Sequence, residues 1–289
     1  MKASLDLLLD AAFPNKTDGV AIDIGAHFGK FTKHLAEIGK FSVIYAFEPN
    51  HNNVIYIKNE IESIVNSEVI LINKALGSSR GMAELFFDDD SSTGSLLAYG
   101  AQYKNIGDIK KSVVDIDTLD AFIDEEVKKR KIDVTFIKID TQGNDLEVIR
   151  GAEKLIHMHR PIIQCELIFV DLYVGQCTPD DIHDFLGSYG YRLYTMCNIH
   201  VNREGQLSFC DAIFVPCEIN IPETQEFSCI DDAQSFQDQI NALSKVCEER
   251  LELIHRLDAE ITRLTKFNRL GIKISTYFDR KLKAIKTFL

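Results

Sequence analysis

Val-Ala-Ile-Asp-Ile-Gly-Ala-His-Phe-Gly, residues 20–29, is the part of this chain from which its architecture can be worked out. Its first half, 20–24, is apolar and largely β-branched except for Asp23, which predicts a buried strand that ends at a glycine turn. Apolar residues at helical spacing follow over 29–38, and a second strand is predicted over 42–47, ending at Glu48. A strand, a glycine turn and a helix place backbone N–H groups at the carboxyl edge of a sheet. Because Glu48 lies at the neighbouring strand tip, where a carboxylate can accept both hydroxyls of a ribose, we expect a nucleoside-binding unit.

The spacing of the glycines indicates which nucleoside is bound. A dinucleotide site has the pattern G-x-G-x-x-G, whereas this chain has Asp23-x-Gly25-x-x-x-Gly29, with an acid two residues before the turn. That acid would repel a pyrophosphate but suits an ammonium group, which S-adenosylmethionine (SAM) carries beside its sulfonium and ribose. We therefore favour SAM over NAD, with Asp23, Gly25 and Gly29 holding its methionine part and Glu48 its ribose. Asn73, after the third strand, is a candidate partner of the adenine ring, and a βαβ unit with another ligand is the alternative.

A long motif further along the chain resembles a known family. Residues 133–151 are Asp-Val-Thr-Phe-Ile-Lys-Ile-Asp-Thr-Gln-Gly-Asn-Asp-Leu-Glu-Val-Ile-Arg-Gly, preceded by Val-Val-Asp-Ile-Asp-Thr-Leu-Asp at 113–120 and followed by Pro-Ile-Ile-Gln-Cys-Glu at 161–166. With the glycine turn, these segments resemble the FkbM-type methyltransferases over roughly residues 18–216. The resemblance implies an α/β fold, the Rossmann-like class I methyltransferase sheet, doubly wound, with seven strands in the order 3-2-1-4-5-7-6. It also implies methyl transfer from SAM, usually to a hydroxyl of a sugar or secondary metabolite.

Two carboxylates are the catalytic candidates. Asp140 ends the fourth predicted strand and Glu166 the fifth, so their side chains are expected to converge above the sheet. Such a pair can act as a general base with an orienting partner, or as two oxygen ligands for Mg²⁺, and the sequence leaves both open. Structural alternatives are that Asp140 caps the next helix and that Glu166 pairs with a base such as Lys138. We expect His27 to be an exposed loop histidine, and no residues are assigned to a metal site.

Composition narrows the function classes. The chain has 289 residues, 45% of them hydrophobic, which is enough for one large domain with an appendage. No run approaches the length of about 18 apolar residues that a membrane span requires, and the amphipathic N-terminal segment does not have the pattern of a signal peptide. The seven cysteines show no Cys-x-x-Cys pair, which favours reduced thiols in a cytoplasmic protein. The net charge of −12 argues against a nucleic-acid partner.

Strands and helices alternate along most of the chain, as in a parallel sheet. Strands are predicted at 20–24, 42–47, 69–73, 134–139, 161–165, 191–195 and 209–215, and helices at about 29–38, 50–64, 117–129, 143–157 and 178–187. Residues 74–115 do not fit the alternation. Within them, 77–81 predicts a hairpin-like turn, and we expect the whole insertion to form one wall of the acceptor site.

The C-terminal part has its own patterns. Apolar residues over 233–270 follow an a/d seam that favours a parallel coiled coil, and 271–289 predicts a basic amphipathic helix. A homodimer through the first helix, and contact of the second with a membrane surface or a glycan-assembly protein, are the expected partnerships. A helix lying back on the domain and a solvated terminal helix are the alternatives. The expected organisation is a helix at 1–17, a SAM-dependent methyltransferase domain at 18–217, a linker at 218–232, a coiled-coil-like helix at 233–270 and a basic helix at 271–289.

These observations predict a SAM-dependent O-methyltransferase that acts on a hydroxyl of a sugar, glycan or related metabolite, with a function in glycan biosynthesis. The protein is expected to be cytoplasmic, and the basic tail also fits a peripheral place at the inner membrane face. Two other classes stay open. A non-catalytic assembly or tethering protein would keep a relict nucleoside pocket, and an NAD-dependent oxidoreductase would use the same βαβ unit, although Asp23 and the missing glycine disfavour it.

Overall fold

The computed structural model describes residues 2–13, 18–62, 64–88, 94–100, 109–129 and 133–219. The chain divides into two units, Met1–Pro222 and Glu223–Leu289, and every helix and strand given below belongs to the first unit. The predicted coiled-coil helix and basic amphipathic helix lie outside the described residues, as does the linker from residue 220 onward. The homodimer and the membrane or protein contacts expected of them therefore stay predictions.

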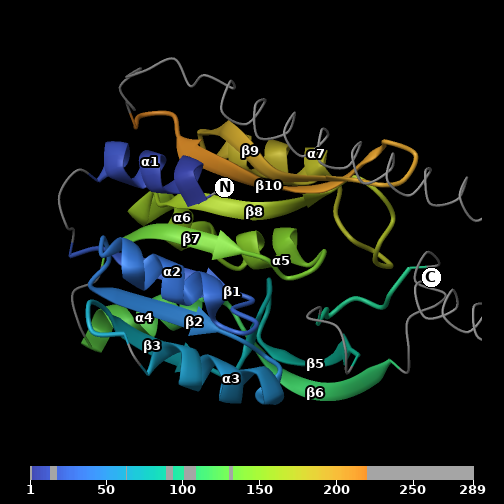
Figure 1. Ribbon diagram of the computed structural model, residues 1–289, viewed down its shortest axis with the longest axis horizontal. Coiled ribbons are helices and arrows are strands. Elements are labelled where there is room, and N and C mark those ends of the chain that lie inside the picture. Colours follow the sequence, from blue (N-terminus) through green and yellow to red (C-terminus); the bar gives the residue numbers. More distant parts are fainter. Residues whose placement is uncertain are drawn as a thin grey trace, which may run out of the picture. The chain divides into compact units, whose positions relative to one another are not determined.

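The centre of the first unit is a seven-stranded sheet with the order β3-β2-β1-β7-β8-β10-β9 (Figure 1). Its strands are Val20–Ile24 (β1), Val43–Phe47 (β2), Glu68–Ile72 (β3), Val134–Ile139 (β7), Ile162–Ile168 (β8), Tyr191–Val201 (β9) and Leu207–Pro216 (β10). The first five strands along the sheet pair in parallel, and β10 is antiparallel to both β8 and β9. When only these seven strands are counted in chain order, the order is 3-2-1-4-5-7-6, which confirms the expected topology.

Helices cover both faces of this sheet, so the doubly wound α/β architecture is confirmed as well. In Figure 1, α1 (Lys2–Ala12), α2 (Lys30–Ile38) and α3 (His51–Ile61) lie in front of it. The other face carries α4 (Leu119–Lys129), α5 (Asp145–Arg150), α6 (Glu153–His159) and α7 (Pro179–Ser188). Each face has its own apolar core, and α1 belongs to the core that α2 forms with the sheet. None of the helices within the described residues is long and apolar enough to cross a membrane.

Burial of both faces explains why the strand predictions were reliable. All five residues of β1 and all five of β2 are buried, as expected for central parallel strands covered by helices. The helix predicted at 143–157 is two helices instead of one. The chain turns at Gly151, whose Cβ, if it had one, would lie 2.0 Å from the backbone oxygen of Gly77. Glycine at this position lets the backbone of the distant Gly77 pass close to the turn between α5 and α6.

The insertion at 74–115 forms a second, smaller sheet of three strands, seen at the lower right of Figure 1. Its strands are Ala75–Leu76 (β4), Gly81–Phe87 (β5) and Lys110–Asp117 (β6), in the order β4-β6-β5. The prediction of a hairpin-like turn at 77–81 is wrong, because β6 lies between the two strands that this turn connects. The turn is a crossover, and β6 supplies the hydrogen-bonding partner of both strands.

Candidate active site

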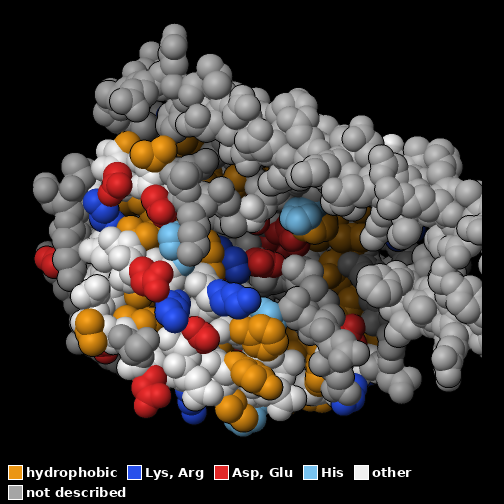
Figure 2. Space-filling model, in the orientation of Figure 1, with side chains coloured by type: hydrophobic (Ala, Val, Ile, Leu, Met, Phe, Trp, Pro, Cys, Tyr) orange, Lys and Arg blue, Asp and Glu red, His pale blue; other side chains and the backbone are white. Residues whose placement is uncertain are grey.

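A cavity of about 160 Å³ lies at the carboxyl edge of the main sheet. Gly25, Glu48 and Asp140 line it, immediately after β1, β2 and β7, so these predicted site residues come together. The opposing wall comes from the insertion, whose apolar contribution is Leu76, Leu85 and Leu96. Figure 2 shows this region on the face that carries α1 and α2, where acidic and basic side chains gather near the centre. The cavity thus has a polar floor from the strand tips and an apolar wall from the small sheet.

The Glu48 carboxylate is buried and already holds three hydrogen bonds. Its Oε2 accepts the backbone N–H of His27 at 2.8 Å, while Oε1 accepts the backbone N–H of Asn50 at 2.8 Å and Nδ2 of Asn53 at 3.2 Å. Burial nevertheless raises the pKa of Glu48 to about 7, against the lowering effect of these donors. A carboxylate has about four acceptor positions, so one further donor in the cavity would stabilise its ionised form.

The loop after β1 is held in a conformation that requires glycine at its first position. Gly25 has φ +76, and a Cβ there would lie 2.0 Å from the backbone oxygen of Asp140. His27, at φ 52, is half-buried and lines the cavity, so the expectation of an exposed loop histidine is wrong. Burial lowers the pKa of His27 to about 4, which keeps the ring neutral, and its Nε2 is buried with no hydrogen-bond partner. Nε2 is therefore a buried polar atom without a partner, in a residue that lines the cavity.

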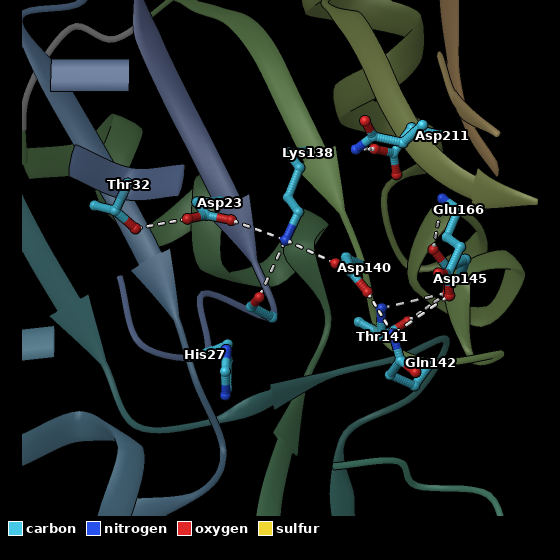
Figure 3. Close-up of polar contacts among 12 residues, drawn as sticks. Asp23, His27, Thr32, Lys138, Asp140, Thr141, Gln142, Asp145, Glu166 and Asp211 are labelled. Atoms are coloured by element: carbon cyan, nitrogen blue, oxygen red, sulfur yellow. Dashed lines mark hydrogen bonds and ion pairs between the residues drawn. The ribbon is translucent and has the colours of Figure 1, made fainter. Parts of the chain in front are cut away.

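Lys138 links the two strands at the centre of the site, as Figure 3 shows. Its Nζ lies 3.5 Å from Oδ1 of Asp23 and 3.3 Å from Oδ2 of Asp140, and it donates to the backbone oxygen of Gly25 at 3.1 Å. Asp23 and Lys138 are register partners on β1 and β7, which brings them together. Burial alone would lower the pKa of Lys138, but the charges of Asp140 and Asp23 raise it above its ordinary value. Lys138 therefore stays charged inside the protein.

Asp23 is completely buried between the strands and does not line the cavity. Its Oδ2 accepts the hydroxyl of Thr32 at 2.6 Å, and its Oδ1 faces Lys138. The prediction that Asp23 holds the methionine part of a donor directly is not matched by this placement. Its contacts instead fix the position of the Lys138 ammonium.

Gln142 connects the two predicted catalytic carboxyls. Its Nε2 donates to Oδ1 of Asp140 at 2.8 Å and lies 3.4 Å from Oε2 of Glu166 (Figure 3). Its Oε1 accepts the hydroxyl of Tyr173 at 2.6 Å. Gln142 has φ 56, an uncommon conformation for a residue with a side chain. Ser95, from the insertion, donates to its backbone oxygen at 2.7 Å. The amide thus joins the carboxyl pair to two surrounding loops.

The acidic cluster around Glu166 has little compensating charge. Burial, and then the charges of Asp140 and Asp145, raise the pKa of Glu166 to about 9. Burial, followed by the charge of Asp140, raises the pKa of Asp145 to about 6, and the pKa of Asp211 is raised by burial first as well. Asp211 is the register partner of Glu166 on the neighbouring strand. At neutral pH the Glu166 carboxyl therefore holds a proton in the free protein.

The remaining predicted site residues have supporting positions. Asn73 donates from Nδ2 to the backbone oxygens of Glu48 and Pro49, at 2.8 and 3.0 Å, so its amide holds the segment that carries Glu48 and does not line the cavity. At Gly29, with φ +78, a Cβ would lie 3.1 Å from a side-chain carbon of Ile57, which links α2 closely to α3. Both residues shape the site without facing the cavity.

The structural alternatives for the two carboxyls are not observed. Asp140 does not cap a helix, because α5 begins at Asp145 and Asn144 occupies its N-cap position. Lys138 forms its ion pairs with Asp23 and Asp140 and not with Glu166. Glu166 is also absent from the cavity lining, although Gln142 ties it to the lining residue Asp140.

The side chains present fit a nucleoside that carries an ammonium group better than they fit a metal. A buried carboxylate with one acceptor position left, a half-buried neutral histidine and a backbone loop that only glycine can form all line one cavity. Within the described ranges, no group of three or more His, Cys, Asp or Glu side chains is arranged to hold a metal ion. The Mg²⁺ alternative for Asp140 and Glu166 therefore has no support, and we derive no step through a metal.

Three residues of the site were missed or undervalued in the sequence. Lys138 interrupts an apolar strand, which indicated a buried partner but not which carboxylates it would meet. His27 gave only its place in the glycine turn as a signal. Gln142 stands next to a glycine inside the long motif, and its left-handed backbone could not be anticipated from its residue type.

Comparison with solved structures gives matches among methyltransferases at low identity. One is a methyltransferase FkbM from Methylobacillus flagellatus KT, at 16% identity and a TM-score of 0.42, with 68% of this chain and 43% of that chain covered. Magnesium protoporphyrin IX methyltransferase from Synechocystis PCC 6803, solved with bound SAM, matches at 11% identity and 0.41, with 73% and 77% covered. TrmK of M. capricolum, solved with S-adenosylhomocysteine (SAH), matches at 12% and 0.40, with 83% and 84% covered. This chain thus spans less than half the length of the FkbM structure.

No curated protein matches the chain. The family described as Methyltransferase FkbM domain matches residues 23–193, which is more than half of the chain and includes every predicted site residue. This range begins at Asp23, in β1, and ends in β9, so it contains the cavity and the strand tips that form it. The chain therefore belongs to the FkbM methyltransferase domain family.

Proposed function

We propose that this chain is a SAM-dependent O-methyltransferase that acts on a hydroxyl of a sugar, glycan or related metabolite. The observation that carries the proposal is the buried Glu48 carboxylate at the tip of β2, which lines the cavity with an acceptor position left on Oε2. The hydroxyls of a ribose are the donors that such a carboxylate suits. Family membership supports methyl transfer, and the structural neighbours solved with SAM or SAH are consistent with this donor.

The donor supplies an activated methyl group, so the task of the protein is mainly alignment and exclusion of water. Glu48 would orient the ribose, and the neutral His27 ring would offer one more hydrogen bond at the same wall. The apolar wall of Leu76, Leu85 and Leu96 would cover the donor and keep water from the reacting groups. These residues do not react themselves.

In this proposal the acceptor is deprotonated by the carboxyl pair of Asp140, which follows β7, and Glu166, which lies within β8. A sugar hydroxyl is a weak nucleophile and needs a base. Glu166, with a pKa near 9 in the free protein, is a strong enough base once it loses its proton, and Gln142 orients it relative to Asp140. We assign Glu166 as the base and Asp140 as its charged partner. The ionised Glu166 carboxylate would accept the hydroxyl proton as the methyl group moves from the donor sulfur to the acceptor oxygen, which leaves the donor as a neutral thioether.

The test is a calorimetric titration of SAM, and separately of NADH, into the wild type and Glu48→Ala. We expect micromolar SAM binding that weakens strongly in the variant, and no comparable NADH binding. A folded protein that binds NADH but not SAM would overturn the proposal in favour of an oxidoreductase. A folded protein that binds neither would indicate the assembly or tethering alternative with a relict pocket.

Once SAM binding is established, methyl transfer is measured with SAM labelled in its methyl group and a panel of sugars and glycans. Label is expected in a hydroxyl ether of the product. Label on nitrogen or carbon would contradict O-methylation while leaving methyl transfer itself intact.

A further inference from the structure

We propose that Asp140, and not Asp23, accepts the ammonium group of the donor, in a charge cluster completed by Lys138. This inference rests on the proposed use of SAM as donor. It replaces the sequence-based assignment of Asp23 and gives Asp140 a contact with the donor besides its relation to Glu166.

Asp23 has no position from which it can meet a ligand in the cavity. Its side chain has 0% exposure, and both of its oxygens face protein groups, Oδ2 the Thr32 hydroxyl at 2.6 Å and Oδ1 the Lys138 ammonium at 3.5 Å. Figure 3 shows Asp23 on the far side of Lys138 from Asp140. A ligand ammonium would have to displace Lys138 to reach it.

Asp140 is placed to receive such a group. It lines the cavity, and its side chain keeps 35% of its exposure. Oδ1 accepts one hydrogen bond from Gln142 and Oδ2 lies 3.3 Å from Lys138, so each oxygen retains an acceptor position. The backbone oxygen of Gly25, another acceptor at this edge, is already bonded to Lys138.

The charges of the cluster call for one more cation. Lys138 contributes one positive charge to the two carboxylates that it contacts, Asp23 and Asp140. Further titratable side chains that interact electrostatically with Lys138 or Asp140 are His27, Glu48, Asp145, Glu166 and Asp211. None of these five supplies a positive charge at neutral pH, since the four acids are neutral or negative and the pKa of His27 is about 4. An ammonium beside Asp140 would balance the pair of carboxylates with a pair of cations.

Glu48 is the other carboxylate of the cavity, and its surroundings suit it for a different part of the donor. It belongs to the tip of β2 and already accepts three hydrogen bonds. In the sheet, β1 lies between β2 and β7, so Glu48 and Asp140 stand on opposite sides of the glycine turn. An extended donor can therefore place its ribose at Glu48 and its amino-acid end at Asp140.

The experiment is a double-mutant cycle between the protein and the ligand. Calorimetry measures the dissociation constants of SAH and of an analogue in which hydrogen replaces the amino group, for the wild type, Asp140→Asn and Asp23→Asn. The exposed Asp184→Asn on α7 is the matched control. Because a charge-assisted hydrogen bond contributes about 1.5–3 kcal/mol, the wild type should prefer SAH to the analogue by about 10- to 150-fold.

We expect Asp140→Asn to lose most of this preference, Asp23→Asn to lose a smaller part of it because Asp23 contributes charge but no contact with the ligand, and the control to retain it. Asparagine keeps an oxygen and the size of the side chain, and a thermal transition reports whether each variant is folded. If Asp140→Asn binds SAH and still prefers it to the analogue as the wild type does, the inference is overturned while SAM binding stands. Loss of the preference in Asp23→Asn alone would also overturn it. If the folded wild type binds neither ligand, the proposed function fails and the inference fails with it.

Discussion

Lowering the pH should weaken donor binding through a single side chain, Glu48. Burial raises the pKa of this carboxyl to about 7 in the free protein, and the ribose hydroxyls are expected to donate to its ionised form. The ionised fraction is about nine-tenths at pH 8 and about one-tenth at pH 6. Because a ligand that needs the ionised form must first remove the proton, the dissociation constant of SAH should rise by roughly tenfold over this interval. The change is a weakening at low pH and not at high pH.

The assay is calorimetric titration of SAH at pH 8 and pH 6 into the wild type and Glu48→Gln. The glutamine variant cannot titrate, so its weaker binding should change little with pH, and it also corrects for the titration of Asp145, whose pKa is about 6. Glu60→Gln is the matched control, because Glu60 is a partly exposed partner of Lys33 away from the cavity. A wild-type dissociation constant that stays constant, or falls, between pH 8 and pH 6 would refute the assignment of Glu48 to the ribose.

Three further predictions follow from the same site. Gly25→Ala should lower the free energy of unfolding, measured by chemical denaturation, by at least about 3 kcal/mol. Gly175 also has a positive φ but has open space around it, so Gly175→Ala should lower this free energy by only about 1 kcal/mol. Equal decreases in the two variants would contradict the steric argument. Lys138→Met should destabilise the protein by about 3–5 kcal/mol because it leaves its carboxylate partners unpaired. Adding Asp23→Asn should restore part of this lost stability. A double variant that is no more stable than Lys138→Met alone would be inconsistent with the ion pair. The rate of methyl transfer should rise by up to tenfold per pH unit above neutrality and level off no higher than about pH 9, because Glu166 loses its proton over this range. Glu166→Gln should abolish that rise. An unchanged pH profile in this variant would exclude Glu166 as the base.

The main sheet could be predicted from the sequence because its strands carry their own signal. Each central strand is a short apolar run bounded by turn residues. Because both faces of these strands are buried, their residues are almost continuously apolar and do not alternate between apolar and polar. The close approach of Gly77 to Gly151, where α5 ends, could not be predicted, since the two residues are distant in the sequence. The small sheet was missed for a related reason. Its middle strand, β6, comes last in the chain, so local turn signals indicated a hairpin that does not form.

The positions of the site residues were easier to predict than their partners. Gly25, Glu48 and Asp140 follow parallel strands, whose carboxyl ends share one edge of the sheet, so their convergence follows from topology. The partners depend on register. Asp23 meets Lys138 because β1 and β7 pair with these two residues opposite each other, and a sequence does not state that alignment. An acid near a glycine turn therefore indicated a ligand contact where the structure has a buried ion pair.

The most direct measurement is a crystal structure of the protein with SAH. The account predicts that SAH occupies the cavity at the ends of β1, β2 and β7, with its ribose hydroxyls within hydrogen-bonding distance of Glu48 and its amino group on Asp140. SAH bound at another edge of the sheet, or with its ribose turned away from Glu48, would contradict the central claim.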